Sequence, residues 1–426
     1  MQPAVLIRFR PLGPWRFGPG EGGQHQVDTI FRSDRLYSAL TLAAESLGFL
    51  DEWLDATARA QTPAVVFSSL FPYQTDMLFA PPPATLWPPP PSLVTSPSPV
   101  FLSKMRWNAA RFIPVTTIEA LLSGQPILAD QWVIDAESGC LLRRNRPSQS
   151  PFRVVSRARA AVDRVSKSSA SLHSSACVEF ENGSGLWSVL RYRDEGAETA
   201  WNSRIQACFR LLADTGFGGH RSSGWGQTAE PEFRSGRWPR LLTPNLDRFA
   251  RAQGNNGSGP NGDMPLFWLL SLYSPASSDS VDWSLGSYGL VLRGGRIQSS
   301  AHASTGDLKK NVRMVAEGSV LSARQEPVGA AVDVAPDGFA HPVYRFGFPL
   351  CLKLPSLRDL TETGPVETTP PDSSLEAEKE EKREEDTPVP LVEAGAEEPP
   401  SITEDAQETP ASDMPNQESE RSDHEI

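Results

Sequence analysis

Two patterns of apolar residues follow one another at the start of the chain. Residues 4–12, AVLIRFRPL, are apolar at most positions and predict a β-strand. After a glycine-rich stretch, apolar residues recur at helical spacing and predict a helix with Ser33 as its N-cap and Gly48 as its stop: Leu36, Leu40, Ala43, Ala44 and Leu47. Residues 64–73, AVVFSSLFPY, then predict a second strand. This order of strand, loop, helix and strand indicates the opening of a ferredoxin-like module.

A second helical pattern lies near the middle of the chain. Residues 198–219, ETAWNSRIQACFRLLADTGFGG, place one apolar face on a helix, made by Trp201, Ile205, Cys208, Phe209 and Leu212. The helix runs directly into GFGGHRSSGWG, residues 216–226, and QTAEPEFR, residues 227–234, then predicts a strand. We call residues 216–226 the glycine loop. Its place after a helix suits glycine, which ends helices and permits positive φ.

Strand patterns dominate after a low-complexity break at residues 251–263. Four strand-like runs follow, at 266–275, 287–298, 312–323 and 341–354. They predict a second, smaller module that is α+β or mostly β. The proline-dense stretch Pro81–Pro99 is expected to be a surface loop. We therefore expect an α+β chain with a domain at 1–250, a linker at 251–263, a domain at 264–358 and a tail at 359–426.

Charge separates the tail from the rest of the chain. The net charge is −12, but residues 361–426 hold 21 of the 52 acids and only 4 of the 40 bases, which leaves 36 bases against 31 acids before them. The tail is rich in proline and almost free of aromatic residues, which predicts disorder. It serves solubility, or it shields the basic body as a polyanion. The acidic total therefore does not exclude a nucleic-acid partner.

Several functional classes find no support in the sequence. Cys140, Cys177, Cys208 and Cys351 are scattered without a C-x-x-C pair, which favours reduced core thiols over disulfides or zinc. The longest apolar runs fall short of the roughly 18–20 residues that span a bilayer. We therefore expect a soluble cytoplasmic protein without a membrane partner, metal or cofactor.

The glycine loop raises the question of what needs so bare a backbone. It follows a helix and precedes a strand, the reverse of nucleotide-binding fingerprints, and it lacks their glycine spacing. Glycines allow a second backbone to approach, serines and N–H groups bond phosphate oxygens, and Arg221 and His220 supply charge. We interpret the loop as a clamp for a phosphodiester chain. The alternative is a flexible loop whose polar groups face water.

A basic run precedes the loop in sequence. Residues 143–167 contain eight bases and one acid, Asp163. Such a run lines a phosphate-tracking groove in single-stranded nucleic-acid proteins, or it forms a solvated face. Arg157 and Arg159 fall on one side of a strand, which fits both readings.

Five stretches together resemble the RAMP proteins of CRISPR effector complexes, and within them subunit four of the type III-A Csm complex. They are FRSDRLYSALTLAAE, AAVDRVSKSSASLHSSACVEF, GFGGHRSSGWGQ, NVRMVAEGSVLS and HPVYRFGFPL, and the likeness covers residues 1–355 in pieces. The resemblance implies two ferredoxin-like (RRM-like) modules and a non-catalytic role. That role is to hold the repeat-derived 5′ tag of CRISPR RNA and to join the large polymerase-type subunit to the subunit-three backbone.

The resemblance also implies which residues contact RNA. These are Gly218, Gly219, His220, Arg221, Ser222 and Ser223 in the glycine loop, Arg157, Arg159 and Arg164 around a hairpin, and Arg32, Ser33 and Arg35 at the first helix. The N-terminus of a helix favours anions, which supports the last group. His220 stands where the family more often has lysine or arginine, so that contact is expected to depend on pH. The stretch 81–99 and the tail after residue 360 have no counterpart in the family.

Two other functions remain open. One is a metal-independent endoribonuclease that processes repeat RNA, with His25 or His220 as general base. Asp28, in the loop before the first helix, lies where related backbone subunits carry a cleaving aspartate. The other is a protein–protein interaction module, in which the loop and HPVYRFG contact protein.

Overall fold

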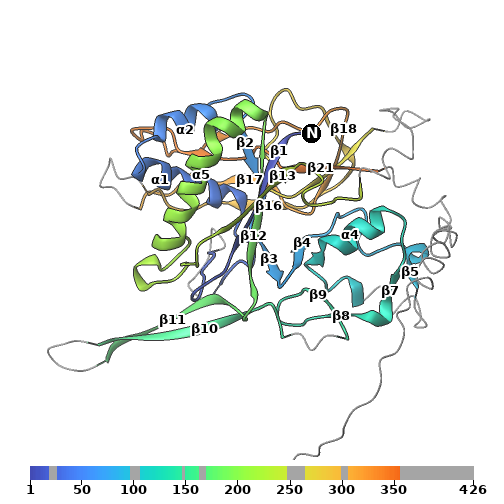
Figure 1. The fold of residues 1–426 in the computed structure, drawn as a ribbon. Coiled ribbons are helices and arrows are strands. Elements are labelled where there is room, and N and C mark those ends of the chain that lie inside the picture. The colour runs from blue at the N-terminus through green and yellow to red at the C-terminus, as the bar shows by residue number, and fades with distance from the viewer. Residues whose placement is uncertain are drawn as a thin grey trace, which may run out of the picture. The chain divides into compact units, whose positions relative to one another are not determined.

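An antiparallel sheet runs through the first two thirds of the chain (Figure 1). Its spatial order is β13-β1-β12-β3-β4-β6, and β2 also pairs with β12. The bounds are β1 Pro3–Phe9, β2 Val65–Phe67, β3 Phe71–Gln74, β4 Met77–Ala80, β6 Ile113–Pro114, β12 Ser184–Tyr192 and β13 Glu232–Arg237. In the register of the central strands, Leu6 lies opposite both Val189 and Arg234. Strand β1 is buried at six of its seven positions, which explains its unbroken apolar run.

The computed structural model describes residues 1–18, 26–95, 106–145, 149–162, 169–246, 264–298 and 306–355, with the side chains of 160–162 and 169–172 left out. All of these residues fall within one unit, Met1–Val366. The predicted tail and the 251–263 linker lie outside the described residues. The predicted domain boundaries stay predictions.

Both predicted helices form, and they pack side by side on the sheet (Figure 1). The helices of the described residues include α1 Ser33–Ser46, α2 Leu50–Ala56, α4 Val115–Leu122 and α5 Glu195–Thr215. The apolar face predicted for α5 is buried throughout. Asp194 caps this helix, since its Oδ1 accepts the N–H of Ala197 at 2.8 Å. Gly216 ends it with φ +75°.

The predicted cap of α1 is wrong. The helix begins at Ser33, and its N-cap position is Arg32, whose backbone is extended and whose side chain makes no capping bond. The Ser33 hydroxyl instead accepts the N–H of Leu272 at 3.0 Å, and its own N–H donates to Ser69 Oγ at 2.8 Å. Packing against the C-terminal part of the chain therefore overrides the local capping preference. The expected stop holds, because Gly48 follows the helix with φ +82°.

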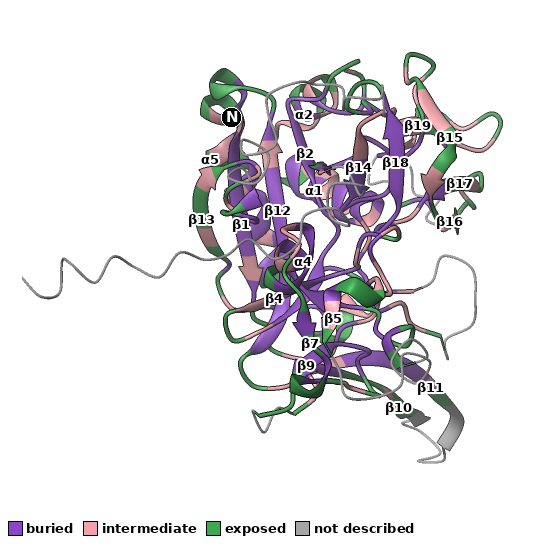
Figure 2. Cartoon of the chain, turned by 90° about the vertical axis from the view of Figure 1, so that its right-hand side faces the viewer, coloured by how far each residue is buried: buried purple, intermediate pink, exposed green. Residues whose placement is uncertain are grey.

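A long insertion separates β4 from β12. It contains η1 Pro91–Leu93, β5 Val94–Thr95, β7 Ile127–Leu128, η2 Ala129–Gln131, β8 Trp132–Ile134, β9 Leu141–Arg143, β10 Phe152–Val162 and β11 Ser169–Phe180. Strands β10 and β11 form a hairpin that projects from the body, and its described side chains are largely exposed toward the tip (Figures 1 and 2).

The prediction that Pro81–Pro99 forms a surface loop is wrong for the first residues of this stretch. The backbone oxygen of Pro81 accepts the indole N–H of Trp268, and Leu86 is buried.

The C-terminal part is built of strands. They are β14 Leu266–Leu269, β15 Val281–Ser287, β16 Leu290–Arg293, β17 Val312–Val315, β18 Val320–Ala323, β19 Val332–Asp333, β20 Tyr344–Arg345 and β21 Cys351–Leu354. Four of them form a sheet in the order β15-β18-β14-β21. The described residues of 264–298 and 306–355 contain no helix. The smaller module thus has strands but, within that range, not the helices of a ferredoxin-like module.

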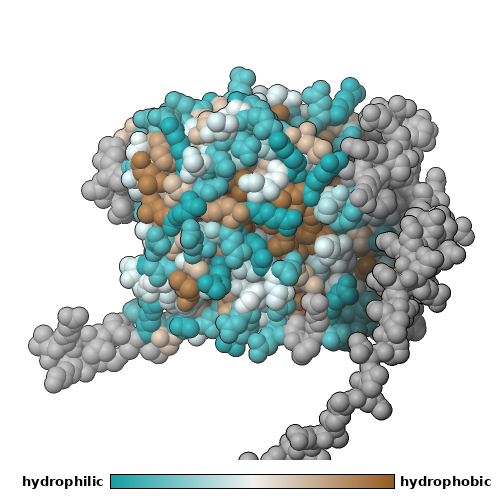
Figure 3. All heavy atoms as spheres, viewed as in Figure 1, coloured by the Kyte–Doolittle hydropathy of each residue, from teal (hydrophilic) through white to brown (hydrophobic). Residues whose placement is uncertain are grey.

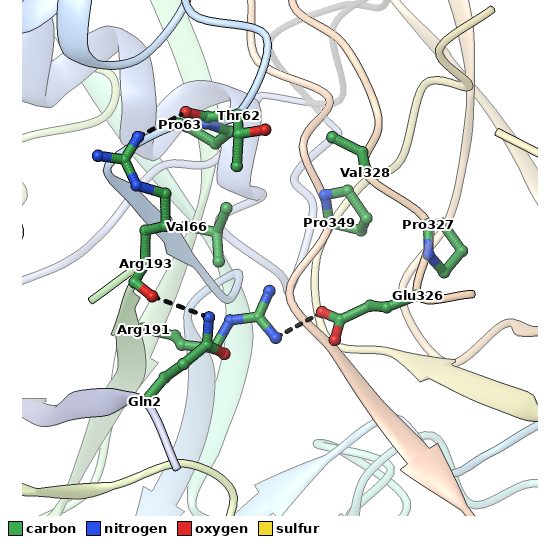
Figure 4. Close-up of a pocket in the computed structure, with 10 residues that line it drawn as sticks. All are labelled: Gln2, Thr62, Pro63, Val66, Arg191, Arg193, Glu326, Pro327, Val328 and Pro349. Atoms are coloured by element: carbon green, nitrogen blue, oxygen red, sulfur yellow. Dashed lines mark hydrogen bonds and ion pairs between the residues drawn. The ribbon is translucent and has the colours of Figure 1, made fainter. Parts of the chain in front are cut away.

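The two parts share one hydrophobic core. The ring of Phe346 stacks on Phe67 at 5.0 Å and on Tyr37 at 4.6 Å between centroids. A pocket of about 190 Å³ lies at another junction, where Arg191 at the end of β12 pairs with Glu326 (Figure 4). Because Phe346 stacks on Tyr37 of α1, the C-terminal part helps to fix the position of this helix.

Candidate nucleic-acid interface

Contacts within the protein explain why several positions of the glycine loop are occupied by glycine. Gly218 has φ +100°, and a Cβ there would lie 2.9 Å from the backbone oxygen of Arg16. At Gly226, φ is +81° and a Cβ would lie 2.2 Å from the backbone oxygen of Phe217. The close approach of a second backbone, predicted for a ligand, is thus made here by the segment at Arg16 and by the loop's own residue Phe217. Gly219 differs, since a Cβ there would meet only the flexible side chain of Arg16, at 3.2–3.4 Å.

Buried aromatic side chains hold the glycine loop against the body of the protein. The ring of Phe217 is buried and lies 4.5 Å from the centroid of Trp15 and 5.3 Å from that of Phe31. Trp225 is also buried, with the ring of His220 against it at 4.9 Å. Both aromatic residues of the loop are therefore held in the body, which favours their structural role over stacking on a base.

The hairpin and the glycine loop meet at Arg159. Its guanidinium lies over the ring of Trp225, 4.8 Å from the centroid, and its Nη1 donates to Ser223 Oγ at 2.6 Å. Arg157, two residues earlier on β10, pairs with Glu179 on β11 through an Nε–Oε1 contact of 2.7 Å. The structure thus brings together Arg159 and the loop, 64 residues apart. Arg164 lies outside the described residues.

The remaining polar groups of the loop face outward to different degrees. Ser222 and Ser223 are exposed on the short helix η3, Arg221–Ser223. Arg221 donates to Gln298 Oε1 of the C-terminal part at 3.2 Å. His220 has a left-handed backbone with φ +60°, and its pKa lies below the ordinary value because of burial and the cations Arg16 and Arg159. Low pH is therefore needed before His220 adds a positive charge.

The three residues predicted at α1 have different surroundings. Arg32 is mostly buried between Asp28, at 2.9 Å, and Glu317. Ser33 is buried and serves the packing of Leu272. Only Arg35 lines the same cavity as the glycine loop.

That cavity has a volume of about 580 Å³ and lies between α1, the glycine loop and C-terminal segments near residues 294–298, 309 and 341–345. Its walls include Arg35 and Gly218–Gly219, and among the cations that no sequence pattern indicated are Arg16, Lys309 and Arg345. Their position depends on long-range packing, since charged residues scattered over three distant segments give no local pattern. Arg345 was within the HPVYRFG motif, but its chemistry was not predicted.

A buried carboxylate organises the floor of the cavity. Asp34 accepts from Arg293 Nη2 at 2.9 Å and from Arg345, and both arginines are buried. Burial alone would raise the pKa of Asp34, but the two guanidinium groups lower it to about 2. The carboxylate is thus charged at neutral pH, and it ties α1 to β16 and β20.

Candidate catalytic residues have structural partners. Asp28 binds Arg32, and its Oδ1 accepts the N–H of Ile30 at 3.2 Å. His25 lies outside the described residues. Within the described part of the chain, no group of three His, Cys, Asp or Glu side chains could hold a metal ion. All four cysteines are free and buried.

No helix within the described ranges is both long enough and apolar enough to cross a bilayer.

Comparison with known proteins confirms the resemblance seen in the sequence. Residues 263–354 match the family described as CRISPR Csm4 C-terminal domain. The "CRISPR system Cms protein Csm4" of Mycobacterium tuberculosis strains CDC 1551 and H37Rv is 30% identical over 179 residues, which is 41% of this chain and 49% of the relative. The chain thus spans about half the length of the curated relatives it matches.

The solved structures that match this chain include two subcomplexes that contain Csm4. One is described as a Csm3-Csm4 subcomplex of the type III-A CRISPR-Cas interference complex; it is 14% identical, with a TM-score of 0.49, and the match covers 83% of this chain and 100% of the other. The other is a Csm1-Csm4 cassette in complex with pppApA, 16% identical, with a TM-score of 0.47 and coverage of 83% and 98%.

Proposed function

Taking the similarity to Csm4 as the premise, we propose that this chain is the RNA-binding subunit of a type III-A CRISPR Csm complex. It holds the repeat-derived 5′ tag of CRISPR RNA and links the large subunit Csm1 to the backbone subunit Csm3. Csm4 is paired with Csm1 in one of the two similar structures and with Csm3 in the other, which supports the choice of partners. The proposed fold of the N-terminal part is ferredoxin-like, because β1, α1, β3, β12, α5 and β13 follow one another in the chain and the strands lie in the order β13-β1-β12-β3.

One observation carries the RNA-binding part of the proposal. Arg159 joins the projecting hairpin to the glycine loop through Ser223 and Trp225. The hairpin arginines and the exposed serines of the loop then form one surface, on which phosphates can meet side-chain cations and hydroxyl groups. Arg221 extends this surface toward the C-terminal part.

The proposed role is non-catalytic and needs no cofactor. The candidate base His220 lies beside Arg16 and Arg159, which disfavour its protonated form. It is therefore a poor general acid for protonating a leaving group. Asp28 is engaged with Arg32. Both side chains have a structural task in the described part of the chain.

Binding of a short RNA with the repeat-derived tag sequence tests this proposal. Phosphate contacts release counterions, so the affinity of the full chain should fall with salt by a log–log slope of about −0.7 for each phosphate neutralised. Arg221→Ala combined with Gly219→Asp should weaken binding while the protein stays folded by circular dichroism. A flat salt response, or unchanged affinity of the double variant, would favour the interaction module instead.

A further inference from the structure

Four cations lie around the buried carboxylate of Asp34, which lines the same cavity as the glycine loop. Asp34 pairs with Arg293 and Arg345, and its field also reaches Arg35 and Lys309. The same four cations repel one another, since Arg293 and Arg345 lower the pKa of both Arg35 and Lys309 in addition to the effect of burial. The cluster therefore carries an excess of positive charge over Asp34, which the field of Asp28 on Arg35 offsets only in part.

Two of these cations have no counter-ion within the described residues. Arg293 and Arg345 bind Asp34, but neither the guanidinium of Arg35 nor Nζ of Lys309 pairs with a carboxylate in that part of the chain. In addition, Nε of Arg345 is buried there without a hydrogen-bond partner. Unpaired charges in a partly buried site are costly, and an anionic ligand relieves that cost.

The unpaired cations face an open space of suitable size. Arg35, Lys309 and Arg345 all line the cavity of about 580 Å³, which falls in the range of roughly 300–1,000 Å³ common for small-ligand sites. The backbone of Gly218–Gly219 and of Gly294–Gly295 lines the same space, so a ligand can approach the main chain closely.

The rest of the cavity combines an apolar wall with the charged residues Glu45, Asp51, Arg59 and Arg296. Leu42, Leu50 and Leu54 line it from α1 and α2, and Val343 and Tyr344 line it from the C-terminal segment. Figure 3 shows hydrophobic residues reaching the surface where Figure 1 places α1 and α2. The cavity thus joins a cationic region to an apolar region that suits a flat ring.

We propose that this cavity binds one nucleoside monophosphate unit, with its phosphate between Arg35 and Lys309 and its base against the apolar wall of Leu42, Leu54 and Tyr344. The phosphate would balance the excess charge around Asp34. The unit is either a free nucleotide or one nucleotide of a bound RNA. In the second case the inference deepens the proposed function and rests on it; in the first it stands independently.

Titration of the full chain with AMP, adenosine and inorganic phosphate tests the site. We expect AMP to bind more tightly than phosphate, and adenosine to bind at least tenfold more weakly than AMP, because both halves of the ligand contribute. Lys309→Met should weaken AMP binding tenfold or more, and Lys309→Arg should retain it. The control is Lys310→Met, which removes an adjacent, exposed lysine paired with Asp337 and should change affinity less than twofold.

The proposal is overturned if AMP fails to bind the folded protein, or if Lys309→Met and Lys310→Met bind AMP equally. Competition with tag RNA then identifies the source of the nucleotide. Displacement of AMP by RNA assigns the site to a nucleotide of the RNA, whereas simultaneous binding assigns it to a free nucleotide. RNA binding without any AMP binding would remove this inference and leave the proposed function intact.

Discussion

Arg159 on the projecting hairpin lies over the ring of Trp225 in the glycine loop, 4.8 Å from its centroid, and donates to Ser223. This contact joins two segments that the sequence marked separately as basic and as glycine-rich. A cation held on an aromatic face next to exposed serines keeps its charge at the surface while its stem is fixed. The hairpin and the loop are thus aligned before any ligand arrives.

Loss of this contact should weaken RNA binding. Arg159→Ala removes a charge and frees the hairpin from the loop, so we expect affinity for tag RNA to fall and the salt slope to shrink by about 0.7. The matched control is Arg210→Ala on α5, an arginine of similar exposure that pairs with Glu230. Filter binding at several salt concentrations measures both effects. Equal losses in the two variants would point to general charge rather than to this surface.

The glycine loop should depend on Gly226 for stability more than on Gly224. Both have left-handed φ, which costs alanine roughly 1–2 kcal/mol. At Gly226 a Cβ would also lie 2.2 Å from the oxygen of Phe217, whereas at Gly224 its nearest contact is a Gln227 side chain at 3.8 Å. Gly226→Ala should therefore lower the free energy of unfolding, measured with urea, by roughly 1–3 kcal/mol more than Gly224→Ala does, because the added methyl group overpacks the loop. Equal costs would contradict the packing described for the loop.

The buried carboxylate Asp34 should be essential for joining α1 to the C-terminal strands. Asp34→Asn leaves Arg293 and Arg345 without their counter-ion, which costs about 3–5 kcal/mol of unfolding free energy. Because folding lowers the pKa of Asp34 from 3.8 to about 2, its contribution is present above pH 4 and is lost as the pH falls toward 2. Exposed Asp51→Asn is the control. An acid-unfolding curve that is the same for wild type and Asp34→Asn would be inconsistent with this role.

Lys309 should lower the stability of the folded protein at neutral pH. Burial, together with Arg345, Arg35 and Arg293, lowers its pKa from 10.5 to about 8, against the opposing pull of Asp34. Below pH 8 the folded protein holds an unfavourable charge, and between pH 8 and 10.5 it loses that proton more readily than the unfolded chain, so stability rises. Lys309→Met should therefore have a higher Tm than wild type at pH 7, with the difference shrinking above pH 8. Lys310→Met should show no such trend, and a lower Tm for Lys309→Met would contradict the account.

The sequence correctly predicted those elements in which apolar side chains are buried and polar side chains are exposed. Helix α5 follows its apolar face because Trp201 is buried against Trp53 of α2 and Phe209 is buried against Phe9 of β1. Strand β15 was missed, since Trp283 and Leu285 are exposed and their apolar character is not tied to a buried face. The cap of α1 failed because Ser33 serves a contact with Leu272, 239 residues away.

The candidate site was predicted only where its residues are neighbours in the chain. The glycine loop and Arg159 were predicted from local composition, but local composition could not show that the loop packs on Arg16 and folds back on its own residue Phe217. The cluster of Asp34 with Arg293 and Arg345 left no mark in the sequence, because buried ion pairs between distant segments look like ordinary surface charges until the fold brings them together.

Recovery of bound RNA tests the central claim most directly. The chain is co-expressed with its genomic neighbours and purified through a tag at its N-terminus, and bound RNA and proteins are identified. The account predicts short RNAs that share one repeat-derived 5′ end, together with a large polymerase-type subunit and a backbone subunit. Recovery of the protein alone at low salt, without RNA, would contradict it.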